Sequence, residues 1–254
     1  MDDIVAIKAL VSQVRPFADW PAEIVERLCR TATIETYEAG QYVYRMDDPP
    51  KGLWIVREGW FQVSRTGANG KRSVLDHQQP GQITGIVGLF DRMGAPFDVQ
   101  ARVAASMVFL PEAAVMAVLE EDPRLMFSVA ALLCRRTRLD YARHFTISFS
   151  SPRAIIARTI LYMLRGRIRS NAAQVEVPVH IPQQDIASLW DMSRQKINAE
   201  MTWFVKQKIL TMRYRRIVAL DVTRLLKLVT DEQPLDQYEL SVLFPNEKFL
   251  NTAM

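Results

Sequence analysis

Cysteine and long apolar runs are both scarce in this sequence. Its two cysteines, Cys29 and Cys134, lie far apart, and neither belongs to a CxxC or Cys/His cluster. We therefore expect no disulfide framework and no zinc site, and we interpret both thiols as small hydrophobic side chains. No stretch approaches the roughly 18 unbroken apolar residues of a membrane span, and the start MDDIVAIKAL lacks the basic residues that open a signal peptide. The sequence therefore predicts a cytoplasmic protein without membrane association.

Enzyme motifs are also missing. The three histidines, His77, His144 and His180, occur singly, without a nucleophile elbow or an HExxH pattern. The glycines between residues 81 and 88 do not match the GxGxxG fingerprint and are better explained as turn residues. We therefore expect no catalytic activity and no resident cofactor.

Positive charge, by contrast, is concentrated in one part of the chain. The formal net charge is +4, yet residues 151–230 alone contain 14 Lys and Arg against 5 Asp and Glu. Residues 231–254 are acidic and carry a single basic residue, Lys248. With 49% hydrophobic and 24% charged residues, the chain can bury a core and suits two modest domains. A basic module attached to a near-neutral domain is typical of a polyanion-binding protein.

The first half of the chain combines a short helix with strand patterns. After Trp20-Pro21, apolar residues at helical spacing predict a helix within residues 19–32. From Tyr42 to Leu110 the period changes to two, and short β-type runs alternate with turn signals. The runs are YVY, LWIV, WFQV, SVL and VFL. Strands spaced about 8 to 12 residues apart predict an antiparallel sandwich or barrel.

Helical patterns dominate after residue 111. Residues 112–120 predict one helix, and Pro123, favourable in a first turn, opens a longer helix that reaches Phe149. The longer helix carries apolar residues at four-and-three spacing: Leu125, Val129, Leu132 and Leu139. This short pattern fits either a dimer seam or a helix lying on the sandwich, and both alternatives stay open. Ser151 and Pro152 predict the start of a further helix, which reaches Leu164, and they mark the best domain boundary.

Residues 181–210 contain two helix starts separated by a tight turn, which predicts a helix-turn-helix. The first helix begins after Pro182 and is expected to bury Ile186, Ala187 and Trp190. The second begins at Ser193, whose hydroxyl can cap the free backbone donors. Its buried face is expected to hold Ile197, Met201, Phe204 and Val205.

The outward face of the second helix carries side chains suited to reading DNA bases. Near the helix N-terminus it presents Arg194, Gln195, Lys196, Asn198 and Ala199. Arg can bind guanine through two hydrogen bonds, and Gln or Asn can do the same to adenine, in the major groove. Residues 210–220 then predict two short strands around a basic turn, which is typical of a wing. The phosphate-contacting wing residues are expected to be Arg213, Tyr214, Arg215 and Arg216.

Over roughly residues 15–228 the chain resembles the Crp/Fnr family of bacterial transcription factors. The segments YEAGQYVY, GLWIVREG, QPGQITGIVGLF and MSRQKIN repeat the family's patterns in their order and spacing. The resemblance implies an α+β protein with an N-terminal antiparallel β-roll of the double-stranded β-helix or jelly-roll type, like that of cyclic-nucleotide-binding domains. A long dimerisation helix and a C-terminal winged helix-turn-helix domain would follow. The implied parts are the roll at 15–120, the dimerisation helix at 121–150, the DNA-binding domain at 151–230 and an acidic extension at 231–254.

The same resemblance implies partners and contacts. Members act as homodimers on a palindromic double-stranded DNA operator near RNA polymerase, and their roll senses a small-molecule effector. Carried over to this sequence, Gln184 would contact phosphate, and Arg194 and Gln195 would read bases. Ala199 stands where many relatives carry a DNA-contacting Arg, which indicates a different operator half-site. The expected DNA-binding residues are Gln184, Ser193, Arg194, Gln195, Lys196, Asn198, Arg213, Tyr214 and Arg215.

The effector site departs from the cyclic-AMP-binding members. Those members hold the ribose with a Gly-Glu pair and the phosphate with an Arg-Ser or Arg-Thr pair, whereas Gly85-Ile86 and Pro96-Phe97 stand here. A buried phosphate needs a charged partner, which only Arg92 or Arg102 could supply, and only in a rearranged pocket. No N-terminal cysteine cluster is present to hold an iron–sulfur centre. We therefore expect an unknown effector other than cyclic AMP. Its pocket is expected to include Gly85, Ile86, Pro96, Phe97, Asp140 and Tyr141.

Two alternative functions stay open. A regulatory module of the cyclic-nucleotide type shares the roll but lacks a helix-turn-helix, and residues 181–217 argue against it. A non-specific nucleic-acid binder would select no consensus sequence. The tail, residues 231–254, is acidic with apolar residues between Pro234 and Pro245, and we expect it to fold back on the protein or on a partner subunit.

Overall fold

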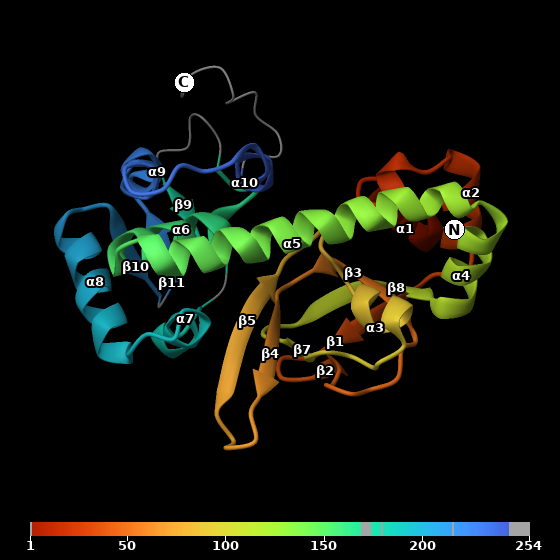
Figure 1. Cartoon of the computed structure of the whole chain (residues 1–254), viewed down its shortest axis with the longest axis horizontal. Helices are drawn as coiled ribbons and strands as arrows, with labels where there is room; N and C mark the ends of the chain where they lie inside the picture. The colour runs from red at the N-terminus through yellow and green to blue at the C-terminus, as the bar shows by residue number, and fades with distance from the viewer. Residues whose placement is uncertain (1, 169–173, 179, 215, 244–254) are drawn as a thin grey trace. The chain divides into compact units, whose positions relative to one another are not determined.

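A computed structural model of the chain describes residues 2–168, 174–178, 180–214 and 216–243. The chain divides into two compact units, unit 1 at residues 1–134 and unit 2 at residues 135–254. The division falls inside the long helix α5 (Met126–Phe149), which is continuous (Figure 1). The helix predicted to open at Pro123 therefore begins with a short 3-10 turn, η2 (Pro123–Leu125), and then continues as α5.

Unit 1 is built around two antiparallel sheets, which confirms the predicted sandwich or barrel. One sheet has the strand order β1-β8-β3-β6 and the other has the order β2-β7-β4-β5. Each of the five β-type runs of the sequence lies in, or overlaps, one of these strands. The strands are β1 (Thr33–Tyr37), β2 (Tyr42–Tyr44), β3 (Gly52–Glu58), β4 (Phe61–Thr66), β5 (Arg72–Gln78), β6 (Ile83–Thr84), β7 (Asp98–Ala101) and β8 (Ala105–Pro111).

The helices of unit 1 include three that were not predicted, at residues 2–11, 17–19 and 86–91. Gly88, which was interpreted as a turn residue, lies in the last of them. The N-terminal helix α1 precedes the predicted short helix, which is α2, and the predicted helix at 112–120 is α4. The described helices of this unit, besides η2 and the start of α5, are α1 (Asp2–Val11), η1 (Phe17–Asp19), α2 (Ala22–Cys29), α3 (Ile86–Asp91) and α4 (Glu112–Glu121).

The turn between β3 and β4 depends on Gly59. Its φ is +86°, a conformation that side chains with a Cβ rarely adopt. A Cβ at this position would lie 2.4 Å from the Cβ of Ala105. The β3–β4 connection can therefore pack against the start of β8 only with glycine here.

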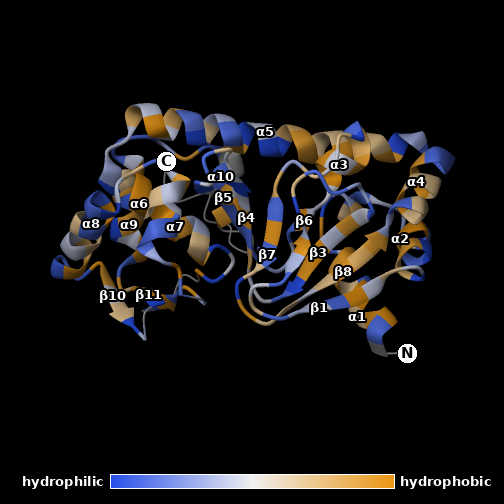
Figure 2. Cartoon of the chain, turned by 90° about the horizontal axis from the view of Figure 1, so that it is seen from below, coloured by the Kyte–Doolittle hydropathy of each residue, from blue (hydrophilic) through white to orange (hydrophobic). Residues whose placement is uncertain are grey.

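Two clusters of apolar side chains fill unit 1. Figure 2 colours the ribbon by hydropathy and shows many hydrophobic residues along the strands of this unit. The first joins α1, α2, α4 and the start of α5 to the sheet β1-β8-β3-β6. The second occupies the interior between the two sheets and is rich in aromatic side chains. Its buried members are Tyr44, Trp54, Val56, Phe61, Val63, Val99, Ala101, Ala105 and Met107.

The start of α5 belongs to the first cluster. Leu125 and Val129 are 7% and 4% exposed, and Leu132 packs against the same cluster. Of the two alternatives for this pattern, the helix lying on the sandwich therefore holds for these three side chains. Leu125 and Val129 are not available to a dimer seam, because folding of unit 1 already removes them from water, whereas Leu132 is only partly buried.

Unit 2 contains the rest of α5 and the predicted helix-turn-helix region. Ser151 caps α6 and accepts a hydrogen bond from the Ala154 N–H at 3.3 Å, as its Ser-Pro start predicted. A small antiparallel sheet has the order β10-β11-β9. The elements after α5 are α6 (Pro152–Leu164), β9 (Val175–Glu176), α7 (Gln183–Leu189), α8 (Arg194–Lys206), β10 (Leu210–Arg213), β11 (Arg216–Ala219), α9 (Val222–Thr230) and α10 (Gln237–Leu243).

The C-terminal segment folds back on unit 2, as predicted for the tail. Helix α10 packs against α6, and Leu243 at its end is fully buried. Residues 244–254 of the predicted extension lie outside the described residues.

No helix in the described ranges combines the length and hydropathy that a membrane span requires. Among the same residues, no group of three or more His, Cys, Asp or Glu side chains is placed to share a metal ion. Cys29 is buried, and burial raises the pKa of its thiol to about 11, whereas Cys134 is exposed.

Candidate nucleic-acid interface

Helix α7 forms the first half of the helix-turn-helix. It begins directly after Pro182, and the three residues predicted to be buried, Ile186, Ala187 and Trp190, are at most 7% exposed. The Trp190 indole donates a hydrogen bond to the Thr159 hydroxyl of α6 at 2.7 Å. Gln184 lies exposed in the first turn of α7. The buried face therefore fixes α7 on α6 and leaves Gln184 at an accessible helix start.

Helix α8 begins where the sequence predicted. The Ser193 hydroxyl caps it by accepting a hydrogen bond from the Lys196 N–H at 3.2 Å. Ile197, Met201 and Phe204 are buried, which confirms three of the four predicted core residues.

The prediction that Val205 belongs to the buried face of α8 is wrong, because this residue is 41% exposed. At about 100° per residue, Val205 lies beyond Met201 at the edge of the buried face. The opposite edge of that face is occupied by Glu200, which is 8% exposed. The buried face is therefore rotated toward Glu200.

Glu200 is a residue that sequence reasoning missed. Its carboxylate accepts a hydrogen bond from Arg153 Nε of α6 at 2.9 Å. It also pairs with Lys196 Nζ at 3.4 Å, one helical turn away. The Arg153 guanidinium lies over the Trp203 ring of α8, 3.7 Å from its centroid. Arg153 therefore connects the first turn of α6 to two successive turns of α8.

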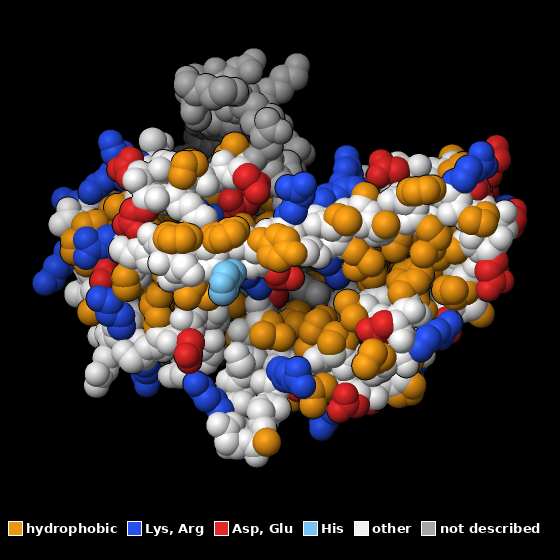
Figure 3. All heavy atoms as spheres, viewed as in Figure 1, with side chains coloured by type: hydrophobic (Ala, Val, Ile, Leu, Met, Phe, Trp, Pro, Cys, Tyr) orange, Lys and Arg blue, Asp and Glu red, His pale blue; other side chains and the backbone are white. Residues whose placement is uncertain are grey.

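The outward face of α8 is exposed and chemically uncommitted. Arg194, Gln195 and Asn198 are exposed, and their side chains have no hydrogen-bond or ion-pair partner within the residues that the structure describes. Ala199 is exposed beside them. Lys and Arg side chains gather over α8 in the space-filling view (Figure 3). This face offers donors and acceptors at the N-terminal end of a helix whose opposite side is fixed in the core.

Strands β10 and β11 form the predicted wing directly after α8. Arg213 and Arg216 are opposite each other at the end of the hairpin. Tyr214 at the tip has φ +49° and is 93% exposed. The two arginines reach β9 and its flank, Arg213 to Gln174 at 3.5 Å and Arg216 to Glu176 at 3.4 Å. The predicted contact Arg215 lies outside the described residues.

The wing and α8 are held in one small body. The Ile209 N–H donates to the Phe204 carbonyl at 3.1 Å, and the Leu220 N–H donates to the Ile209 carbonyl at 2.8 Å. Helix α8 also packs against α7 and α6. The structure therefore brings the described residues of the predicted DNA-binding set together in unit 2.

The residues predicted for an effector pocket are divided between the two units. Gly85, with φ +93°, precedes α3, and a Cβ there would lie 2.5 Å from the Gly52 carbonyl oxygen. Ile86 is 1% exposed and belongs to the first apolar cluster of unit 1. Pro96 and Phe97 are half-buried in unit 1, whereas Asp140 and Tyr141 are exposed on the unit 2 part of α5. The burial of Ile86 is therefore explained by its packing in the first apolar cluster.

Aromatic side chains crowd the roll interior near Gly85. The Tyr44 ring lies 5.3 Å from that of Trp54 and 6.5 Å from that of Phe97, measured between centroids. The Tyr44 hydroxyl shares a short hydrogen bond with the Thr84 hydroxyl, and Trp54 Nε1 donates to Glu35 at 2.9 Å.

The two arginines that could have served a phosphate have partners of their own. Arg92 forms an ion pair with Glu112, and Arg102 Nη1 donates to Gln62 at 3.0 Å. A phosphate at either guanidinium would have to compete with these contacts.

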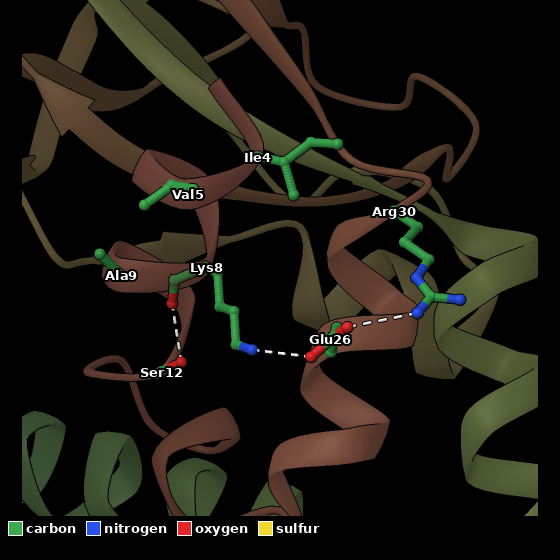
Figure 4. A pocket seen from close by; sticks show the side chains of 7 residues that line it. All are labelled: Ile4, Val5, Lys8, Ala9, Ser12, Glu26 and Arg30. Atoms are coloured by element: carbon green, nitrogen blue, oxygen red, sulfur yellow. Dashed lines mark hydrogen bonds and ion pairs between the residues drawn. The ribbon is translucent and has the colours of Figure 1, made fainter. Parts of the chain in front are cut away.

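A separate hollow of about 580 Å³ lies between α1 and α2 (Figure 4). Its charged side chains are already paired: Lys8 with Glu26 at 2.7 Å, and Arg30 with the same carboxylate at 3.2 Å. Lys8 and Arg30 hold the pKa of the Glu26 carboxyl below its usual range, and Lys8 has the larger effect. The charged side chains of this hollow are therefore paired with one another, unlike Arg194 on the outward face of α8.

Models of two families match the chain. The cyclic nucleotide-binding domain matches residues 34–122, and the Crp-like helix-turn-helix domain matches residues 156–228. The first match lies in unit 1 and the second in unit 2.

Similar proteins of known name agree with these matches. The HTH-type transcriptional regulator Cmr of Mycobacterium tuberculosis is 21% identical over 197 residues, which are 78% of this chain and 76% of that protein. A CRP-like cAMP-activated global transcriptional regulator from the same organism is 19% identical over 225 residues, 89% of this chain and 98% of that protein. The solved structure of FixK2 from Bradyrhizobium japonicum matches with a TM-score of 0.68 and 18% identity, covering 78% of this chain and 97% of that one. The last likeness shows the shared fold.

Proposed function

Since the chain belongs to the Crp/Fnr family of transcription regulators, we propose that it binds a specific DNA operator, with α8 in the major groove. The observation that carries this proposal is the outward face of α8, where Arg194, Gln195 and Asn198 are exposed without partners among the described residues. Exposed amide and guanidinium groups on a fixed helix are the groups that read base edges. Arg194 would bind guanine, and Gln195 or Asn198 would bind adenine.

The remaining predicted contacts would position α8 rather than read sequence. Gln184, at the start of α7, and Ser193, at the start of α8, lie where backbone N–H groups favour phosphate. Lys196 would add positive charge near the same phosphates. Arg213, Tyr214 and Arg215 of the wing would contact the flanking phosphates. Contacts to phosphate fix the register and orientation of the protein on the duplex.

We further propose that the protein acts as a homodimer on a palindromic operator, with α5 as the seam. In unit 1, α5 exposes Phe127, which is 79% accessible, and Cys134. In unit 2, it exposes Tyr141, Phe145 and Phe149, and the last two rings stack 6.3 Å apart. Hydrophobic side chains lie along the visible face of α5 in Figure 3. Large exposed aromatic side chains on one helix are typical of a surface that a second subunit covers.

The roll would sense a small molecule other than cyclic AMP. The ribose and phosphate anchors of cyclic-AMP-binding members are absent from the sequence, and Arg92 and Arg102 are already paired. Gly85 and Phe97 flank the aromatic cluster of unit 1, and an effector there would contact rings rather than charges. Such a regulator would act in the cytoplasm, where it meets DNA and RNA polymerase.

A sequencing-based binding selection with the full-length protein tests the DNA-binding proposal. We expect enrichment of one palindromic consensus, and binding to it that is at least about 1,000-fold tighter than to random duplex of the same length. Enrichment of no sequence would contradict the operator and favour a non-specific nucleic-acid binder.

Cysteine cross-linking tests the dimer. Cys134 is exposed on α5, whereas Cys29 is buried, so a short bis-maleimide should join two copies only through Cys134. We expect a cross-linked dimer from the parent, none from Cys134→Ser, and an unchanged yield from Cys29→Ser. A protein that sediments as a monomer at micromolar concentration would contradict the dimer.

A further inference from the structure

The segment at residues 231–243 continues beyond the region that matches the helix-turn-helix domain, which ends at residue 228. It is acidic, yet it lies against the end of α5 and along α6 rather than in solvent alone. Three of its side chains, Glu232, Gln233 and Glu239, make polar contacts with these helices.

Glu232 and Gln233 hold the junction between α5 and α6. The Glu232 carboxylate accepts hydrogen bonds from the Ser151 N–H at 2.5 Å and from the Ser151 hydroxyl at 2.6 Å. The Gln233 side-chain carbonyl accepts from the Ser150 hydroxyl at 3.4 Å. It also lies 3.3 Å from the Thr146 hydroxyl, which donates to the Ala142 carbonyl at 2.8 Å as well. Thr146 lies on α5 and Ser151 caps α6. Two consecutive residues therefore bridge the last turn of one helix to the first turn of the next.

Glu239 attaches the segment to the middle of α6. It forms an ion pair with Arg158, and the two side chains are 4% and 3% exposed. The Tyr162 hydroxyl donates to the same carboxylate at 3.0 Å, and Arg158 Nη2 also donates to the Gln233 carbonyl at 3.0 Å. Burial, followed by the nearby Glu239 charge, raises the pKa of Tyr162, so this hydroxyl keeps the proton that it donates. A buried pair with this many hydrogen bonds is costly to break, because separation leaves an unpaired charge.

Glu239 also helps to form the helix that presents it. The Asp236 carboxylate accepts from the Glu239 N–H at 2.7 Å, and the Glu239 carboxylate accepts from the Asp236 N–H at 3.2 Å. This reciprocal arrangement is a capping box, which satisfies free donors at a helix start. The same carboxylate therefore starts α10 and binds α6.

The contacts of α6 extend to the DNA-facing helix. Arg153, two residues after the Ser151 cap, binds Glu200 and lies over Trp203 of α8. Helices α6 and α8 therefore belong to one body, and whatever fixes α6 against the end of α5 also fixes α8 against it.

We propose that residues 231–243 are a positioning element that fixes the angle between α5 and the body containing α8, through Glu232, Gln233 and Glu239. The inference rests on the proposed binding of a dimer to a palindrome. Two recognition helices must then lie about 34 Å apart, one turn of DNA. A fixed junction sets that spacing before DNA is bound, so less conformational freedom is lost on binding. A single half-site needs only the internal geometry of one α8, which Arg153 maintains without the segment.

Two truncations separate this role from a general structural one. The first ends the chain after Asp231 and removes the segment, and the matched control ends it after Leu243 and retains the segment. Each protein is measured on the selected palindrome and on the same duplex with one half-site scrambled. We expect the first truncation to lower affinity for the palindrome by about tenfold, the equilibrium effect of one hydrogen bond to a charged group. Half-site affinity should stay within about twofold, and the control should match the parent.

A point variant provides the test if the truncation that ends after Asp231 fails to fold. Glu232→Ala removes two hydrogen bonds at an exposed position and leaves no buried charge unpaired. We expect it to lower only the palindrome affinity, by about threefold, with Asp231→Ala as the control of equal charge. Circular dichroism would confirm that both retain the helical content and melting temperature of the parent.

An unchanged ratio of palindrome to half-site affinity in both the truncation and Glu232→Ala would overturn the positioning role. Equal losses of affinity on both duplexes leave this ratio unchanged as well, and they would indicate damage to α8 itself. A parent protein without any preference for the palindrome would instead contradict the proposed function.

Discussion

The roll of unit 1 and the outward face of α8 in unit 2 use their polar side chains in opposite ways. In unit 1, Arg92 and Arg102 are paired with Glu112 and Gln62, and Trp54 Nε1 donates a hydrogen bond to Glu35. In unit 2, Arg194 and Gln195 on α8 have no partner within the described part of the chain. Trp54 and Gln62 are buried, so pairing of their polar groups offsets the cost of removing them from water, whereas the exposed groups of α8 remain available to a ligand. The contrast distinguishes a region organised for its own stability from one organised for recognition.

The largest expected effect comes from the roll interior. Trp54 is 5% exposed and lies between Tyr44 and Phe109, whose ring centroids are 5.3 and 4.8 Å away. Trp54→Ala should lower the free energy of unfolding by about 3–5 kcal/mol, because it empties a packed site. It also removes one of the two donors to Glu35 within the described residues, the other being the Tyr37 hydroxyl. Chemical denaturation measures this directly.

The matched control for Trp54→Ala is an exposed aromatic side chain in unit 2. Tyr214 is 93% exposed, so Tyr214→Ala should change the free energy of unfolding by less than about 0.5 kcal/mol. Equal destabilisation by the two substitutions would remove the contrast between the units.

A smaller effect, of the opposite kind, is expected at α8. Arg194→Ala should cost about 1–3 kcal/mol of operator affinity and relax the preference at one base pair. Its free energy of unfolding should change by less than about 0.5 kcal/mol, since the side chain has no partner among the described residues. Competition binding on operator and random duplex measures the first, with Arg92→Ala as the control arginine. Equal loss on the two duplexes would show that Arg194 does not read bases.

The smallest effect is expected at the wing. Arg213→Ala should weaken binding to all sequences alike and reduce the slope of log affinity against log salt by about 1. Titrations at several salt concentrations give that slope. A changed consensus, with the slope unaltered, would assign Arg213 to base reading instead.

Local signals in the sequence predicted the helix-turn-helix well. The caps at Ser151 and Ser193, the helix start after Pro182 and the wing all depend on residues within a few positions of each other. Capping and helical periodicity are local effects, so a single sequence contains them. Which outward residues contact DNA stays a prediction.

Long-range pairing accounts for what the sequence did not reveal. Strand β9 has two residues, and its partner β11 lies about 40 positions further on. The burial of Glu200 was not predicted, because it depends on Arg153, which lies 47 positions earlier in the chain. The tail was predicted to fold back from its apolar content alone, but its bond from Glu239 to Arg158 spans 81 positions. The apolar repeat of α5 was ambiguous because a roll and a second subunit cover a helix with the same chemistry.

The buried pair of Arg158 and Glu239 also has a consequence for temperature. Hydration of charged groups becomes less favourable on warming, so the desolvation penalty of such a pair falls as temperature rises. Apolar contacts do not gain in the same way. The attachment of α10 to α6 should therefore hold better in heat than contacts of similar strength between apolar side chains, and unit 2 should keep its C-terminal helix in place as it approaches unfolding.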